Sequence, residues 1–146
     1  MRIVPVFGGP PTPYVLWCIA GSILLFECVF QLADHGVVGS FDLRSRLFRL
    51  AAFWDNQFPP GTVDDALYPG QSYVMLVSYV FLHAGMIHAF MNAVILISLS
   101  KTLAIYLSLR LVLISMVLGA ISSALFFGWL ANTSAPMIGA SGVVFA

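Results

Sequence analysis

Apolar residues dominate three long stretches of the chain, and polar residues separate these stretches. About 20 mostly apolar residues are enough for a helix to cross a bilayer. The stretches that meet this criterion are residues 14–33, a segment within residues 73–100, and residues 111–131. A fourth apolar segment opens at Gly139 and continues to Ala146. The pattern predicts three membrane-spanning helices and the beginning of a fourth.

Polar residues mark the predicted ends of these spans. Asp34-His35-Gly36 closes the first span and Lys101 the second, whereas Arg110 and Asn132-Thr133-Ser134 bound the third. The apolar run after Pro13 is too long for a signal peptide, which favours a retained helix. We therefore expect an all-α fold, a polytopic transmembrane helix bundle.

Composition supports this fold class. The chain is 60% hydrophobic and 8% charged, whereas soluble domains are about 25% charged. The formal net charge is zero, which argues against nucleic acid as a partner. The segment that opens at Gly139 is too short to cross a bilayer before Ala146. Residues 1–146 are thus expected to form a single membrane domain that is incomplete at its C-terminus.

A long polar loop, residues 35–71, separates the first two spans and contains a helical pattern. Leu43, Leu47, Leu50 and Trp54 recur at helical spacing, and the charged residues Asp42, Arg46 and Arg49 fall off this stripe. The pattern predicts an amphipathic helix with Asp42 as N-cap, lying either in the membrane interface or packed on the bundle as a surface helix. Pro59-Pro60-Gly61 is expected to end it, and Tyr68-Pro69-Gly70 to form a turn before the second span.

The basic residues alone do not decide the orientation of the bundle. Equal numbers lie on the two sides: Arg2, Lys101 and Arg110 on the side of the N-terminus, and Arg44, Arg46 and Arg49 in the long loop. The loop arginines are interleaved with apolar residues of the amphipathic helix. We therefore give them less weight in the positive-inside rule and expect a cytoplasmic N-terminus.

Three polar side chains lie within the second apolar stretch, where such groups are costly and usually functional. His88 and Asn92 are four residues apart and share one face of a helix. On a regular helix His83 is about 140° away from His88, so the two could not chelate one metal. With no HExxH motif, a zinc protease is poorly supported, and interhelical hydrogen bonding is the structural alternative.

The fourth segment opens with Gly139-Ala140-Ser141-Gly142, which follows Pro136. Glycines allow a sharp turn, and the unpaired N–H groups at a helix start can stabilise an oxyanion. A serine there, with a histidine and an amide on a neighbouring helix, suits acyl transfer. A GxSG match alone is weak because small residues also mediate helix packing, which is the role expected of Gly119 and Ser123 in the third span.

Together these features resemble the rhomboid family of intramembrane serine proteases. The matching segments are Phe81-Leu82-His83-Ala84-Gly85-Met86-Ile87-His88-Ala89-Phe90-Met91-Asn92 and Gly139-Ala140-Ser141-Gly142-Val143-Val144-Phe145-Ala146. Their order along the chain matches as well: a first span, a long loop, the histidine-containing helix, a plain third span and then GxSG.

The resemblance implies a role for each matching residue. Ser141 would be the nucleophile. His88 and Asn92, with backbone N–H groups at Ala140 and Ser141, would stabilise the oxyanion. His83 would organise the loop and its waters, and Gly139 and Gly142 would frame the nucleophile.

The resemblance also implies an environment and partners. The enzyme would need no cofactor and no metal, and would cleave transmembrane segments of other membrane proteins. It would be a multi-pass protein of the lipid bilayer, expected in the plasma (inner) membrane of a bacterium. The substrate and the oligomeric state are left open.

The chain departs from the family pattern at three places. The family's general base is a histidine on the sixth helix, and no histidine follows Ser141. The loop has Tyr73-Val74-Met75 where a Trp-Arg pair is frequent, and residues 100–104 lack the usual glycine and glutamate. Because a serine without a base is a poor nucleophile, residues 1–146 alone are expected to be inactive. The alternative is a non-catalytic rhomboid-like pseudoprotease that binds transmembrane helices.

Overall fold

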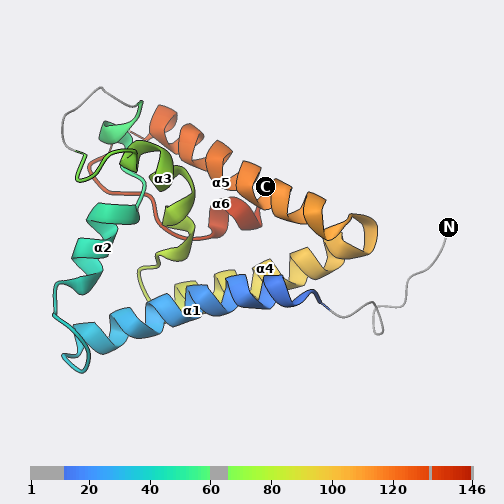
Figure 1. Cartoon of the computed structure of the whole chain (residues 1–146), viewed down its shortest axis with the longest axis horizontal. Helices are drawn as coiled ribbons and strands as arrows, with labels where there is room; N and C mark the ends of the chain where they lie inside the picture. The colour runs from blue at the N-terminus through green and yellow to red at the C-terminus, as the bar shows by residue number, and fades with distance from the viewer. Residues whose placement is uncertain (1–11, 60–65, 132, 146) are drawn as a thin grey trace.

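The structure is a computed structural model that describes residues 12–59, 66–131 and 133–145. The described residues form helices and connecting segments and contain no strand (Figure 1). In chain order the elements are α1 (Tyr14–Asp34), α2 (Leu43–Ala51), η1 (Asp55–Gln57), α3 (Gln71–Ser78), η2 (Tyr79–Phe81), α4 (Met86–Tyr106), α5 (Leu109–Leu130) and α6 (Ser141–Val144).

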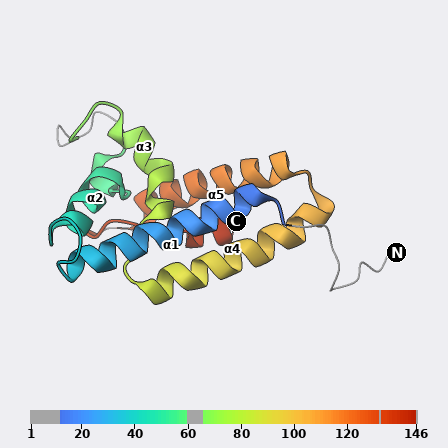
Figure 2. The same cartoon turned by 60° about the horizontal axis from the view of Figure 1, so that its bottom comes forward.

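Three of the described helices, α1, α4 and α5, are long and apolar enough to cross a membrane. Less than a third of the most apolar window of each is buried, as expected for helices whose outer faces meet lipid. Helices α1 and α4 lie side by side in both ribbon views, and α5 diverges from them (Figures 1 and 2). Helix α6 sits between α4 and α5 and contacts both. The fold is thus the transmembrane helix bundle that the apolar pattern predicts.

The two ends of the bundle differ. Helices α2 and α3 and the segment that leads into α6 gather at one end, whereas the short connection between α4 and α5 lies at the other (Figure 1). Phe53 and Met137 join the long loop to the segment before α6 through paired backbone hydrogen bonds of 3.1 and 2.9 Å. The segment that carries the GxSG motif is therefore built into the loop end of the bundle.

The first and third spans agree closely with the predicted stretches. Helix α1 covers residues 14–34, and Gly36 follows it with a φ of 71°, a conformation that favours glycine. Helix α5 begins earlier than predicted because the Ser108 hydroxyl accepts a hydrogen bond from the Leu111 N–H, which places Arg110 inside the first turn. Arg2, Pro60, Gly61, Asn132 and Ala146 lie outside the described residues, so the boundaries predicted on them are not tested.

The second span, predicted within residues 73–100, is α4, and the apolar residues before it do not continue this helix. Helix α3 and the short helix η2 end at Phe81, and α4 begins at Met86 after an irregular segment, residues 82–85. Residues 73–100 are mostly apolar, and hydrophobic periodicity does not reveal an interruption within such a run. Lys101 also does not end the span: it lies within α4, where a long side chain can extend its ammonium group toward the membrane surface.

Helix α2 is shorter than the predicted stripe. It ends at Ala51, well before Pro59, and Trp54 lies beyond it with its indole N–H donating to the Phe48 carbonyl at 3.0 Å. Asp42 precedes the helix as predicted but does not cap it, because its carboxylate is bonded to Ser40 and Arg46. The half-buried face of α2 packs on α1 and α3. Its position in the membrane interface stays a prediction.

Candidate functional site

Ser141 is the first residue of α6, and Gly139 makes the turn that leads into it. Gly139 has a φ of 102°, which residues with a side chain rarely adopt. A Cβ atom there would lie 3.0 Å from His88 Cε1 and 3.1 Å from His88 Nε2. The GxSG segment therefore requires its first glycine for both conformation and space.

Backbone hydrogen bonds hold the segment before Ser141 against other elements. The Gly139 N–H donates to the Tyr79 carbonyl at 3.0 Å. The next residue, Ala140, is fully buried, and its N–H donates to His83 Nε2 at 3.4 Å. The turn is thus fixed by residues of η2 and of the break that precedes α4.

Ser123 attaches α6 to α5. Its hydroxyl donates to the Gly142 carbonyl at 3.1 Å. A Cβ atom at Gly142 would lie 2.6 Å from Ser123 Cβ and 3.0 Å from the Tyr79 hydroxyl, so only glycine fits without movement. These contacts agree with the packing role predicted for Ser123, and Gly119 is likewise buried in α5.

His88 and Asn92 lie on the same face of α4, and both approach the turn before Ser141. A Cβ atom at Gly139 would lie 3.6 Å from Asn92 Nδ2, close to the contacts that it would make with His88. Asn92 is only 5% exposed, whereas His88 is exposed. The structure therefore brings His88 and Asn92 next to Gly139, two residues before the serine.

His83 lies in the break and not on α4. The angular separation from His88 that was predicted for a regular helix therefore does not apply. The two imidazole rings are 4.9 Å apart between centroids, at an angle of 72°. His83 is fully buried, and its Nε2 accepts from Asn92 Nδ2 at 3.0 Å as well as from the Ala140 N–H. An Nε2 that accepts two hydrogen bonds carries no proton, so the ring is the neutral Nδ1–H tautomer.

The surroundings of His83 favour this neutral form. Burial, reinforced by neighbouring His88, lowers the pKa of His83 to about 4. The Phe81 carbonyl opposes this effect, although His83 Nδ1 makes no hydrogen bond within the described residues. His83 therefore acts as an acceptor that orients the Asn92 amide and the Ala140 N–H.

The Ser141 hydroxyl has no hydrogen-bonded base among the described residues. Its side chain is half-buried, and within residues 12–59, 66–131 and 133–145 its hydroxyl makes no hydrogen bond. As the first residue of α6, it has a backbone N–H that no carbonyl of the same helix can accept. The Ser141 N–H is therefore free to donate a hydrogen bond to a substrate oxygen, whereas the Ala140 N–H already donates to His83. The same described residues contain no group of three potential metal ligands among His, Cys, Asp and Glu.

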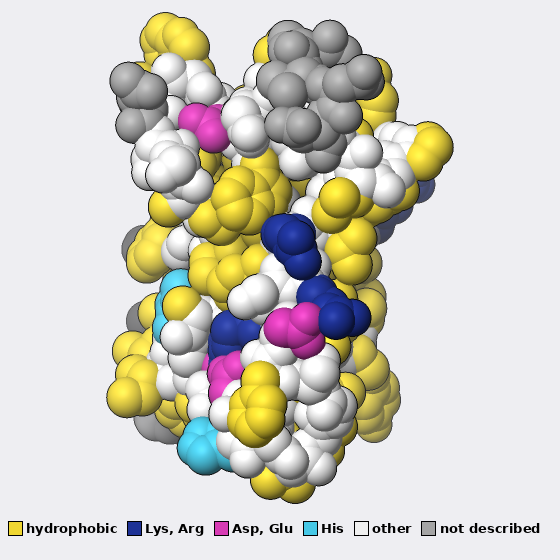
Figure 3. Space-filling view, turned by 90° about the vertical axis from the view of Figure 1, so that its left-hand side faces the viewer, with side chains coloured by type: hydrophobic (Ala, Val, Ile, Leu, Met, Phe, Trp, Pro, Cys, Tyr) yellow, Lys and Arg dark blue, Asp and Glu magenta, His cyan; other side chains and the backbone are white. Residues whose placement is uncertain are grey.

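A buried ion pair that the sequence analysis did not identify lies behind His83. Glu27 of α1 is fully buried, and its carboxylate accepts two hydrogen bonds of 3.0 Å from the Arg44 guanidinium. Arg44 also binds Asp34 at 2.8 Å and donates to the His83 carbonyl at 2.8 Å. Basic and acidic side chains gather together on this end of the molecule (Figure 3).

Glu27 and Asp34 stabilise the positive charge of Arg44. Burial disfavours its guanidinium charge, but hydrogen bonds and attraction from Glu27 and Asp34 outweigh this cost and raise the pKa of Arg44 above its ordinary value. The signal in the sequence was Glu27 itself, since an acidic residue inside a span needs a partner. The spacing along α2 could not show which of the three loop arginines reaches it.

Comparison with known proteins identifies the family of the chain. The rhomboid domain family model matches residues 70–146, more than half of the chain. No curated protein and no solved structure matches. The matched region contains the break with His83, the α4 face with His88 and Asn92, and the turn into Ser141. With three helices of membrane-spanning length among the described residues, the chain is an integral membrane protein and belongs to the rhomboid family.

Proposed function

We propose that this protein is an intramembrane serine endopeptidase with Ser141 as its nucleophile. The observation that carries the proposal is the contact of His88 and Asn92 with Gly139, at the turn that presents Ser141. Family membership alone leaves open whether the chain is a protease or a pseudoprotease. Two polar side chains next to the turn that leads into a serine at a helix start support the protease.

In this mechanism the Ser141 hydroxyl oxygen attacks the carbonyl carbon of the scissile peptide bond, and a base removes its proton. The carbonyl oxygen becomes an oxyanion, which His88, Asn92 and the Ser141 N–H would stabilise. When the tetrahedral intermediate collapses, the C–N bond breaks and the base gives its proton to the leaving amine. Water then hydrolyses the acyl-enzyme, which releases the second product and restores the serine.

Two donors near the site are already occupied by His83. Asn92 Nδ2 and the Ala140 N–H both point to His83 Nε2. Asn92 retains a second amide hydrogen, so it can donate to an oxyanion without leaving His83. The Ala140 N–H has one hydrogen only, so its proposed contribution to the oxyanion requires that it leave His83.

The general base is the missing component. No described residue makes a hydrogen bond to the Ser141 hydroxyl, so the contacts of the described residues do not identify the base. A pseudoprotease that binds transmembrane helices is the second candidate function, because membership of the family fits it as well as it fits the protease.

The proposed substrates are transmembrane segments of other membrane proteins. The exposed apolar faces of α1, α4 and α5 support a location in the bilayer, where such segments are found. We further propose that the protein resides in the plasma membrane of a bacterium, with the long loop on the outer side.

The test uses the open reading frame that encodes this chain, expressed in bacterial membranes with a transmembrane reporter substrate. We expect reporter cleavage and labelling of Ser141 by a fluorophosphonate probe, and Ser141→Ala should abolish both. Ser45→Ala, which replaces an exposed serine of α2, is the control and should retain both. Reporter binding without cleavage or labelling would support the pseudoprotease. Ser141-dependent cleavage by residues 1–146 alone would contradict the expectation that these residues are inactive by themselves.

A further inference from the structure

The ion pair between Glu27 and Arg44 is too costly to be an ordinary surface contact. Glu27 is 0% exposed, and the Arg44 side chain is 17% exposed. Removing a charge from water costs several kcal/mol, which the attraction between the partners often fails to recover. Hydrophobic residues of similar size could pack α1 against α2 at no such cost. The pair therefore calls for a role other than stability.

Arg44 of α2 contacts two other parts of the chain, α1 and the break before α4. Its guanidinium binds Glu27 and Asp34 on α1, and the same group donates to the backbone carbonyl of His83 at 2.8 Å. The carbon at the centre of its guanidinium also lies 4.9 Å from the centre of the Phe30 ring. Arg44 thus links α1 to the backbone of the break before α4.

The other side of His83 faces the serine. Its ring accepts from Asn92 of α4 and from Ala140, the residue directly before Ser141. The contacts form a continuous chain from the Glu27 carboxylate through Arg44 and His83 to the proposed oxyanion donors. The first part of this chain is absent from the region that the rhomboid family model matches, which begins at residue 70.

We propose that Glu27 and Arg44 are positioning residues of the Ser141 site. The buried pair fixes the His83 backbone, so that the His83 ring holds the Asn92 amide and the turn before Ser141 in place. The effect on catalysis rests on the proposed function, whereas the effect on the structure of the turn does not.

The decisive variant is Glu27→Gln combined with Arg44→Met. It removes both charges together, which avoids the unpaired buried charge that would destabilise a single variant. It also removes the donor to the His83 carbonyl. Arg49→Met is the matched control, because Arg49 lies on the same helix and its side chain is exposed.

The first measurement is amide hydrogen exchange of the protein in lipid nanodiscs, which needs no catalytic activity. In the double variant we expect exchange of residues 79–85 and 137–141 to accelerate by about tenfold or more, because these segments lose their anchor. Exchange of residues 112–124 in α5 should not change. Arg49→Met should match the wild type throughout. Unchanged exchange at residues 137–141 in a folded double variant would overturn the proposal.

Arg44→Lys gives a second, milder variant should the double variant not fold. Lysine keeps the positive charge opposite Glu27, but its single ammonium cannot reproduce the planar fork that reaches two carboxylates and a carbonyl. The same segments should exchange faster than in the wild type. Wild-type exchange in Arg44→Lys would overturn the proposal.

Cleavage kinetics separate this proposal from the proposed function. If the wild type cleaves the reporter, the double variant should lower kcat by about 10²-fold, the scale expected for misplaced catalytic groups, with KM unchanged. A wild type without activity would refute the protease, while exchange would still decide the positioning role. An unchanged kcat in the double variant would show that the pair does not position the catalytic groups, and would overturn the proposal.

Discussion

At Gly139 the backbone conformation and the neighbouring side chains both exclude a larger residue. A Cβ atom there would meet the His88 ring at 3.0 Å, in a backbone conformation that alanine tolerates poorly. Gly139→Ala should therefore destabilise the turn by about 1–3 kcal/mol and displace His88. Thermal unfolding and Ser141 labelling measure the two effects.

Gly21→Ala is the control for this substitution. Gly21 lies in α1 with no atom within 4 Å of its would-be Cβ, so alanine should be neutral or stabilise the helix by up to about 1 kcal/mol. If Gly139→Ala unfolded and labelled like the wild type, the turn would have to be more adaptable than its contacts indicate.

Asn92 is the best-placed side chain for testing oxyanion stabilisation. It is buried, it faces Gly139, and it has one amide hydrogen to spare beside the one donated to His83. In an active enzyme, Asn92→Ala should lower kcat by about 10²- to 10³-fold, the usual effect of losing one oxyanion donor. Asn56→Ala, at an exposed position of the long loop, should not change it. Wild-type kcat in Asn92→Ala would assign Asn92 to packing alone.

The neutral state of His83 predicts a specific pH dependence of stability. The pKa of His83 is about 4 in the folded protein, against an ordinary value of 6.5. Between these values the unfolded chain binds a proton that the folded protein does not, so stability decreases as the pH falls from 6.5 to 4. The unfolding temperature in detergent should fall over this interval.

Two variants identify the group responsible. His83→Gln should flatten the decrease between pH 6.5 and 4, whereas His35→Gln, at the exposed end of α1, should retain it. An equal decrease in His83→Gln and the wild type would assign the effect to another group.

At the scale of elements, the break at residues 82–85 determines the geometry of the site. Because α4 begins only at Met86, His83 is free to turn its ring toward Asn92 and Ala140. The long apolar stretches predicted α1 and α5 well, and the pair His88–Asn92 lay on one face as expected from its spacing. The break could not be predicted because the residues directly on either side of it are apolar. The hydrophobic pattern shows which residues can lie in lipid, but it does not show where one helix ends and the next begins.

The site was predicted at the level of motifs but not of contacts. Spacing placed Ser141 at a helix start and associated it with α4. Spacing could not reveal the hydrogen bonds of His83, since they depend on how η2 and the break fold back against the segment before α6. For the same reason, Glu27 and Arg44, which are 17 residues apart and lie on two helices, gave no local pattern.

The contact between α5 and α6 gives a prediction at this scale. Gly142→Ala would place a methyl group 2.6 Å from Ser123 Cβ and should push α6 away from α5, lowering the unfolding temperature. Adding Ser123→Gly removes the obstructing atoms and should recover part of the loss. Ser122→Gly, a neighbour whose hydroxyl bonds only within its own helix in the described structure, is the control and should recover nothing. Equal effects of the two serine substitutions would contradict direct contact.

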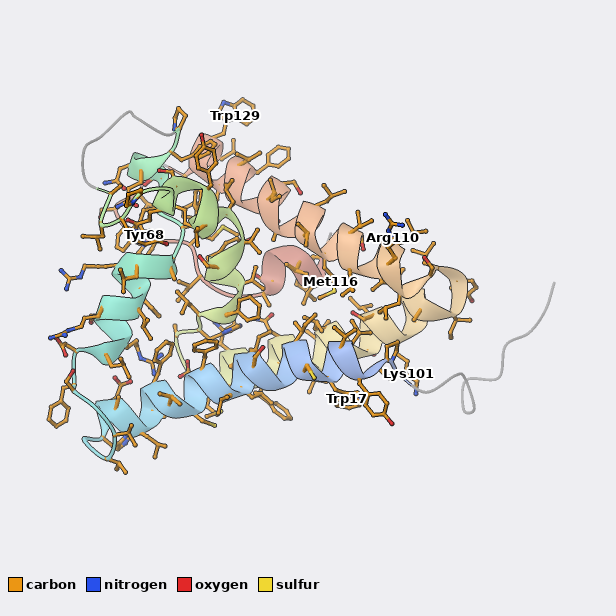
Figure 4. All side chains as sticks on the ribbon, viewed as in Figure 1. Trp17, Tyr68, Lys101, Arg110, Met116 and Trp129 are labelled. Atoms are coloured by element: carbon orange, nitrogen blue, oxygen red, sulfur yellow. The ribbon has the colours of Figure 1, made fainter. Side chains whose placement is uncertain are left out.

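At the scale of the whole molecule, the bundle has two distinct ends. Lys101 and Arg110 lie at the end with the α4–α5 connection, whereas Tyr68 and Trp129 lie at the end with the loop and the site (Figure 4). Trp17, which is 55% exposed, lies toward the first end, and Trp129, which is 79% exposed, toward the second. Exposed tryptophans toward both ends match the aromatic belts of membrane proteins.

The polarity of the bundle favours a cytoplasmic end at Lys101 and Arg110. Exposed cations are attracted to the anionic lipids of the cytoplasmic leaflet. Of the three loop arginines, Arg44 is enclosed by carboxylates and Arg46 is paired with Asp42. The loop end therefore offers fewer free cations than the basic residues counted along the sequence suggest. The Ser141 site would then open toward the outer side of the membrane.

Cysteine labelling tests this orientation. Cys18 and Cys28 are free and exposed, so both are first replaced by alanine. A membrane-impermeant maleimide should label Asn56→Cys in intact cells, and Tyr106→Cys only after permeabilisation, because the loop and the α4–α5 connection lie at opposite ends of the bundle. The reverse pattern would invert the orientation and place Ser141 near the cytoplasmic surface. Labelling of both cysteines from one side would contradict a bundle that crosses the membrane three times.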